Sequence, residues 1–163
     1  MLGDADQQVQ RESIRAIVQI GTDAAFAVLQ RALATGSCSR DTIVQQLIAQ
    51  RDVKAIPLLC HVLHHTPPRG PLAAAHLQIV EALGSLSARA ESTETLRFVL
   101  NRGIWWAPFR TRALQEAAAT ALARLGTTET MAVLEEATRN GSRRVRKIAR
   151  TKIAGAQREG PRP

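Results

Sequence analysis

The amino-acid sequence predicts an all-α fold, a superhelix (solenoid) of about four helical hairpins followed by one closing helix. The main observation is an internal repeat: GTDAAFAVL, residues 21–29, returns as GTTETMAVL, residues 126–134. Each copy follows a stretch that ends in Ile-Gly or Leu-Gly and has apolar residues at helical spacing. Because one hairpin cannot bury both of its apolar stripes, successive hairpins are expected to stack on one another.

The first hairpin begins close to residue 7 and turns at a glycine. Gly21, like Gly126 in the second copy, can close a helix because glycine readily adopts the left-handed conformation. The threonine that follows each glycine can accept a hydrogen bond from a free amide of the next helix. The residues expected in the buried stripes are Val9, Ser13, Ile14, Ile17 and Ile20 in the first helix and Phe26, Leu29 and Leu33 in the second.

The later hairpins follow the same pattern with longer connections. RDVKAIPLLCHVL, residues 51–63, matches the second helix of the first hairpin, and ESTETLRFVL, residues 91–100, ends a third hairpin. RALQEAAATALARLG and GTTETMAVLEEATRNG form the fourth, and SRRVRKIARTKIAG, residues 142–155, is the closing helix. We expect one domain over residues 1–155 and a disordered tail over residues 156–163.

Five segments share a common pattern: VQRESIRAIVQIG (9–21), RDVKAIPLL (51–59), EALGSL (81–86), RALQEAAATALARLG (112–126) and VRKIAR (145–150). They resemble HEAT repeats, in particular the bacterial HEAT-like repeats first named for phycobilisome lyases, over nearly the whole chain. The resemblance implies a right-handed superhelix but no single activity, because the family includes scaffolds, lyases, hydroxylases and DNA-repair enzymes. The sequence departs from the family at Gln10 and Gln115, where an arginine is usual, and keeps it at Arg146.

Two proline-containing segments interrupt the repeat, HHTPPRGPL at residues 64–72 and RGIWWAPF at residues 102–109. Both lie between one hairpin and the next, so in a stack they are expected to emerge as neighbours, roughly 10 Å apart. Tryptophan and arginine are enriched at binding hot spots. We therefore predict a partner-binding site made of Arg69, Arg102, Trp105, Trp106, Phe109 and Arg110. The alternative is that the two tryptophans only fill a gap between hairpins.

The formal net charge of +8 belongs to the C-terminal part of the chain, since residues 1–96 contain more acidic than basic side chains. In the closing helix, Val145, Ile148, Ala149 and Lys152 share one face at helical spacing, which places the cations on the opposite face. The predicted basic patch consists of Arg143, Arg144, Lys147 and Arg150. Three interpretations stay open: a solubilising cap of the solenoid, a nucleic-acid contact, and a contact with an acidic protein.

The sequence contains no motif that indicates catalysis. We find no nucleophile elbow, phosphate-binding loop or dinucleotide fingerprint, so we expect no enzyme and no cofactor. His61 and His65 stand one helical turn apart, but a metal site needs three or four ligands and none completes a convincing set, so we expect no metal. Cys38 and Cys60 are read as reduced, with Cys60 in the core. A signal peptide and membrane spans are also not evident, which predicts a cytoplasmic protein without membrane contact.

These observations favour a non-enzymatic protein–protein interaction scaffold with a protein partner of unknown identity. Nucleic-acid binding through the basic closing helix is the first alternative, by analogy with HEAT-like alkylation-repair glycosylases. The second alternative is a phycobilin-lyase-like lyase or chaperone for a prosthetic group that uses the Trp105 loop. The first hairpin has no evident polar cap before it, so self-association through the N-terminal repeat face is also possible.

Overall fold

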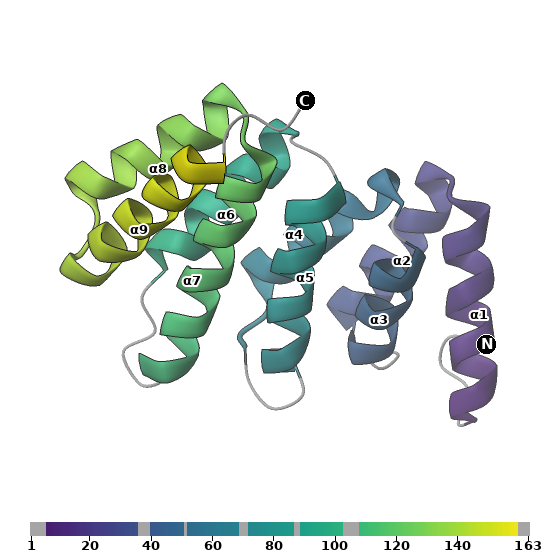
Figure 1. Cartoon of the computed structure of the whole chain (residues 1–163). Helices are drawn as coiled ribbons and strands as arrows, with labels where there is room; N and C mark the ends of the chain where they lie inside the picture. Colours follow the sequence, from purple (N-terminus) through teal and green to yellow (C-terminus); the bar gives the residue numbers. More distant parts are fainter. Residues whose placement is uncertain are drawn as a thin grey trace. The chain divides into compact units, whose positions relative to one another are not determined.

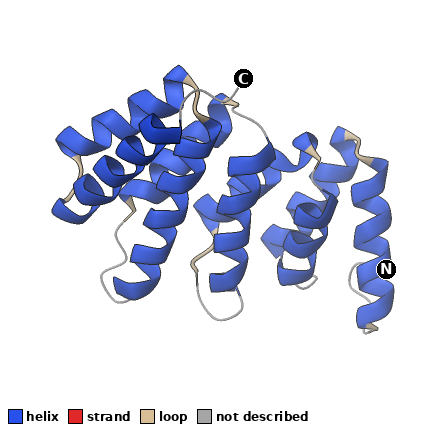
Figure 2. Cartoon of the chain, viewed as in Figure 1, coloured by secondary structure: helices blue, strands red, loops and turns tan. Residues whose placement is uncertain are grey.

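The computed structural model describes residues 6–35, 40–50, 52–68, 72–86, 89–102 and 108–159. These residues form nine α-helices and one short 3-10 helix and contain no strand (Figure 1, Figure 2). The predicted all-α class is therefore confirmed, and within each unit helices pack on their neighbours as in a solenoid of hairpins. The chain divides into two compact units, Met1–Ala75 and His76–Pro163, which are described separately.

The first predicted hairpin consists of α1, Gln7–Ile20, and α2, Asp23–Thr35. Gly21 ends α1 with a φ of 59° and donates its backbone N–H to the carbonyl oxygen of Ile17. The hydroxyl of Thr22 then accepts a hydrogen bond from the Ala25 N–H at 3.3 Å and so caps α2. The predicted glycine closure and threonine cap are both present.

The rest of the first unit consists of α3, Arg40–Gln50, the 3-10 helix η1, Val53–Ala55, and α4, Ile56–His65. α1 packs against both α2 and α3. The ammonium of Lys54 donates to the Gly21 carbonyl oxygen at 3.3 Å, which places a cation at the carboxyl end of α1. Cys60 on α4 is a buried free thiol, as predicted. The largest fully buried side chains of this unit are Ile14, Leu29, Ile43, Leu47, Ile56, Leu59 and Leu63.

The buried stripe of α1 differs from the predicted one. Ile14 and Val18 are almost fully buried, whereas Val9 is 37% exposed and Ile20 is 64% exposed. Ile17 is half-buried. The prediction that Val9 and Ile20 belong to the core was wrong, because helical spacing identifies an apolar face but does not show whether a neighbour covers it.

The second unit contains most of α5, Leu72–Leu86, and then α6, Ala90–Asn101, α7, Pro108–Leu125, α8, Thr128–Asn140, and α9, Arg143–Glu159. α6 packs against α7 and α8, and α9 packs against the same two helices. The hairpin α7–α8 thus packs against both α6 and α9. The largest fully buried side chains here are Ile79, Leu83, Leu96, Leu100 and Leu122.

The turn between α7 and α8 repeats the turn of the first hairpin. Gly126 has a φ of 61°, and the Thr127 hydroxyl accepts a hydrogen bond from the Thr130 N–H at 3.3 Å. On the same hairpin, Glu136 of α8 forms an ion pair with Arg97 of α6, with 3.0 Å between Oε1 and Nη2. This pair joins the hairpin to the helix that precedes it.

Gly84 on α5 lies so close to α7 that a Cβ added to it would be 2.6 Å from the Cβ of Ala121.

α9 continues to Glu159, past the boundary at residue 155 that the sequence suggests for the folded part. Residues 160–163 lie outside the described range.

Candidate functional site: a basic surface on α7 and α9

The predicted docking cluster lies largely outside the part of the chain that the structure describes. Arg69, Trp105 and Trp106 are outside it, as are the side chains of Phe109 and Arg110. Arg102 is described, and the two segments predicted to be neighbours do follow the ends of α4 and α6. Whether the cluster forms as a unit stays a prediction.

Arg102 is held at the end of α6 by its surroundings. Its guanidinium carbon lies 5.4 Å from the centroid of the Phe98 ring, a cation–π distance. Its carbonyl oxygen accepts a hydrogen bond from Nε2 of Gln115 on α7 at 3.4 Å. Gln115 stands where the family usually has arginine. Its hydrogen bond holds the backbone at Arg102, the first residue of the segment that contains Trp105.

Arg102 also acts on the imidazole of His76. His76 lies on α5 and is almost fully buried. Burial, and secondarily the charge of Arg102, lower the pKa of His76 to about 4. The side chain is therefore neutral at pH 7. Protonation of this buried imidazole at lower pH costs the folded state free energy.

The other three histidines gather at the end of α4. The rings of His61 and His65 have centroids 4.3 Å apart, and His64 lies 6.5 Å from His65. Burial, followed by the nearby rings of His65 and His64, lowers the pKa of His61. Across the described residues, no three side chains of His, Cys, Asp or Glu are placed to hold a metal ion. This cluster therefore provides no metal site that the structure can support.

α9 separates its apolar and basic side chains as its sequence indicates. Val145, Ile148 and Ala149 are buried against the hairpin α7–α8. Lys147 and Arg150 are exposed on the other side of the helix. The structure thus brings the predicted patch together on one helix, while its function is untested.

An open cleft of about 370 Å³ runs between α7 and α9. Its basic members are Arg112, Arg144, Lys147 and Lys152. The buried Ile148 and the exposed Thr151 also line it, together with Glu116. The cleft therefore combines several cations with an apolar contact and one carboxylate.

A second hollow lies on the outer side of α9. It is lined by Arg143, Arg146, Lys147, Arg150 and Thr151. Lys147 and Thr151 line both hollows, so the two adjoin each other along α9. We call this whole area the basic surface; its cations are Arg112, Arg143, Arg144, Arg146, Lys147, Arg150 and Lys152.

Three members of the basic surface, Arg112, Arg146 and Lys152, were not predicted from the sequence. Arg112 lies on α7 and joins the cleft only because α7 packs against α9, which no spacing along the chain reveals. Lys152 was assigned to the buried face, but it is half-buried and reaches the cleft. Lysine often buries its methylene stem and keeps its ammonium at the surface, which is the signal that could have identified it.

The electrostatics of the basic surface suit an anionic ligand. Arg112 Nε and Glu116 Oε1 are 2.9 Å apart, so one carboxylate is already paired at the wall of the cleft. Glu116 is the one acidic residue among the described lining residues of the two hollows, beside seven basic residues. Guanidinium groups bind carboxylates and phosphates in a bidentate manner, so both are candidate ligands.

The comparisons with known proteins concern the repeat and not the basic surface. Within the described residues, no helix has the length and apolar character needed to cross a membrane. No curated protein matches the chain. The family model described as PBS lyase HEAT-like repeat matches residues 9–35 and 114–140, so the predicted resemblance is confirmed for these two segments, which span most of the hairpins α1–α2 and α7–α8.

Proposed function

We propose that this chain is a non-enzymatic HEAT-like repeat module that binds a protein partner, and that the basic surface takes an acidic segment of that partner. The observation that carries the proposal is the cleft between α7 and α9, where Arg144 and Lys147 lie beside the apolar Ile148. A peptide with carboxylates and an aliphatic side chain can satisfy both kinds of contact at once. Such a module is a scaffold in the sense that it joins partners without altering them.

The composition of the cleft favours protein over nucleic acid. Glu116 stands at its wall, and a carboxylate repels a phosphate backbone, whereas a peptide can offer Glu116 a donor. Among the described residues, no aromatic side chain lines either hollow. Single-stranded nucleic acids commonly stack their bases on aromatic side chains, so these lining residues offer phosphate contacts and no stacking.

The proposal can be tested with two labelled probes of similar negative charge. One is a peptide in which Glu and Leu recur at helical spacing, and the other is a short oligothymidylate. Fluorescence anisotropy should show binding of the peptide to the wild-type protein. Lys147→Glu should weaken this binding about tenfold or more, because Lys147 lines both hollows. Arg158→Glu is the matched control, since Arg158 is an exposed residue of α9 that lines neither hollow.

Nucleic-acid binding is the second candidate, supported by the number of arginines on the basic surface. Under this candidate the oligothymidylate binds more tightly than the peptide. Its affinity would also fall steeply between about 50 and 200 mM salt, because phosphate contacts release counterions. That outcome would replace the protein partner by a nucleic acid.

A prosthetic-group lyase or chaperone is the third candidate. It is supported by the name of the matched repeat, which refers to PBS lyase. It depends on the Trp105 loop, which lies outside the described residues. A pigment that copurifies with the protein and is lost in a Trp105→Ala, Trp106→Ala variant would support this candidate.

A further inference from the structure

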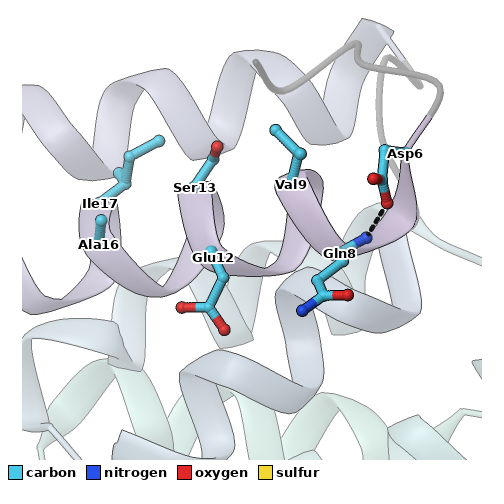
Figure 3. A pocket seen from close by; sticks show the side chains of 7 residues that line it. All are labelled: Asp6, Gln8, Val9, Glu12, Ser13, Ala16 and Ile17. Carbon is cyan, nitrogen blue, oxygen red and sulfur yellow. Dashed lines mark hydrogen bonds between the residues drawn. The ribbon is translucent and has the colours of Figure 1, made fainter.

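One face of the first hairpin carries apolar side chains that the described residues leave partly exposed. An open groove follows α1 and is lined by Asp6, Gln8, Val9, Glu12, Ser13, Ala16 and Ile17. Figure 3 shows Val9, Ser13 and Ile17 following one another along one side of α1, with Gln8 and Glu12 on the other side. Ile20 at the end of α1 and Val28 on α2 add two further exposed aliphatic side chains.

The second matched repeat shows what normally covers this face. The matched segments are equally long, so Val9 corresponds to Leu114 and Val28 corresponds to Val133. Leu114 is 6% exposed and Val133 is 8% exposed, against 37% for Val9 and 46% for Val28. In the second unit, α6 packs against both α7 and α8, and Gly84 of α5 lies against Ala121 of α7. The same face is therefore buried in the second repeat and partly exposed in the first.

The close approach at Gly84 defines what a covering helix must look like. Ala16 of α1 corresponds to Ala121 of α7. The Cβ of Ala121 lies so close to Gly84 of α5 that a Cβ added to this glycine would be only 2.6 Å away. A helix that crosses α1 at the same depth needs a small residue opposite Ala16. α1 itself provides such residues at Ser13 and Ala16 on its exposed or half-buried side.

The charges of the face are self-complementary. In the second repeat, Glu136 of α8 pairs with Arg97 of the covering helix. Its counterpart in the first repeat is Arg31, which is exposed and can pair with an acidic side chain instead. Glu12 is exposed on α1 and lines the groove. In a contact with twofold symmetry, residue i meets residue j and j meets i, so each copy can place Glu12 near Arg31 of the other.

We infer that two copies of this chain associate through the α1–α2 face, with α1 crossing α1 at Ser13 and Ala16. Each copy then covers aliphatic side chains of α1 and α2 whose counterparts are buried in the second repeat. The twofold contact closes on itself, so it gives a dimer and not a fibre. This inference concerns a different surface from the basic surface and does not depend on the proposed function.

Sedimentation equilibrium of the full chain over a wide concentration range tests the inference. We expect a reversible monomer–dimer equilibrium. Ala16→Glu should raise the dissociation constant about tenfold or more, because it places a carboxylate in the centre of the contact. Ala132→Glu is the matched control, because Ala132 is an exposed alanine of α8. Circular dichroism should show that both variants stay folded.

A charge exchange gives an independent measurement. Glu12→Arg and Arg31→Glu should each weaken the dimer, and the double variant should regain most of the lost affinity. A protein that stays monomeric at all concentrations would overturn the inference. A dimer whose dissociation constant is the same in the wild type and in Ala16→Glu would overturn it as well, because another surface would then be responsible.

Discussion

Gly84 on α5 and Ala121 on α7 meet at a point where the two helices leave no space for a further methyl group. A Cβ on Gly84 would lie 2.6 Å from the Cβ of Ala121 and 2.8 Å from its Cα. The second contact involves backbone, so a rotamer change cannot relieve it. The glycine is therefore required for the approach of these helices within the second unit.

Gly84→Ala is expected to destabilise the protein by about 1–3 kcal/mol, the usual cost of overpacking a close contact. Gly155→Ala is the control, because Gly155 lies on α9 and a Cβ there would meet nothing within 4 Å. That variant should stabilise the protein by about 0.5–1 kcal/mol through helix propensity. Urea denaturation measures both changes, and an equal effect of the two variants would contradict the close approach.

Gly126→Ala is expected to lower the free energy of unfolding by about 1–2 kcal/mol. Gly126 has a φ of 61°, which costs an alanine energy because of its Cβ, and the nearest atom to that Cβ is a carbonyl oxygen at an ordinary 3.7 Å. The cost is therefore conformational and not steric crowding by neighbours. Gly126→Asn should be milder, because asparagine tolerates the left-handed region. An alanine variant as stable as the asparagine variant would refute this explanation.

The Arg97–Glu136 pair is expected to contribute little to stability. Both side chains are close to half exposed, at 41% and 44%. A double-mutant cycle with Arg97→Ala and Glu136→Ala should give a coupling energy of about 0.5 kcal/mol that decreases at high salt. A coupling of several kcal/mol would show that the pair is more shielded from solvent than its exposure indicates.

His76 is expected to make stability depend on pH. Its pKa is lowered from 6.5 to about 4 in the folded state. Above pH 6.5 the imidazole is neutral in both states and has no effect. As the pH falls from 6.5 to 4, the unfolded state takes up the proton first, so stability is lost over this window, by about 2 kcal/mol at pH 5.

Comparing the wild type with His76→Gln isolates this contribution, because the histidines of α4 remain in both proteins. Denaturant midpoints at pH 7.5 and pH 5 should move further apart in the wild type than in the variant. Equal shifts in the two proteins would mean that His76 takes up its proton without a penalty.

The sequence was sufficient to predict the turns at the two glycines, but it did not show which helix faces are buried. Gly21 with Thr22, and Gly126 with Thr127, determine their turns through local backbone chemistry, so reading along the chain finds them. The exposure of Val9 and Leu114 could not be predicted in this way, because both residues occupy the same place in the apolar pattern of their helices but only Leu114 is buried. The burial of the leucine depends on the helices that pack against α7, which lie far from it in the sequence or are not marked by any local pattern.

The candidate site divides in the same manner. Arg143, Lys147 and Arg150 share a face of one helix, which the helical period predicts. Arg112 joins them through the packing of α7 on α9, and that contact depends on long-range folding. Tryptophan chemistry singled out Trp105, but its surroundings depend on a loop whose course no local pattern determines.

The thiol of Cys60 gives the first unit a built-in probe of opening. Only 3% of this residue is exposed, so an alkylating reagent can reach the sulfur only when α4 separates from its neighbours. In a Cys38→Ser background, the rate of modification under native conditions would therefore measure how often that region opens. Compared with the loss of helical signal from the whole chain, this rate would show whether the two units lose their structure in one step or in succession.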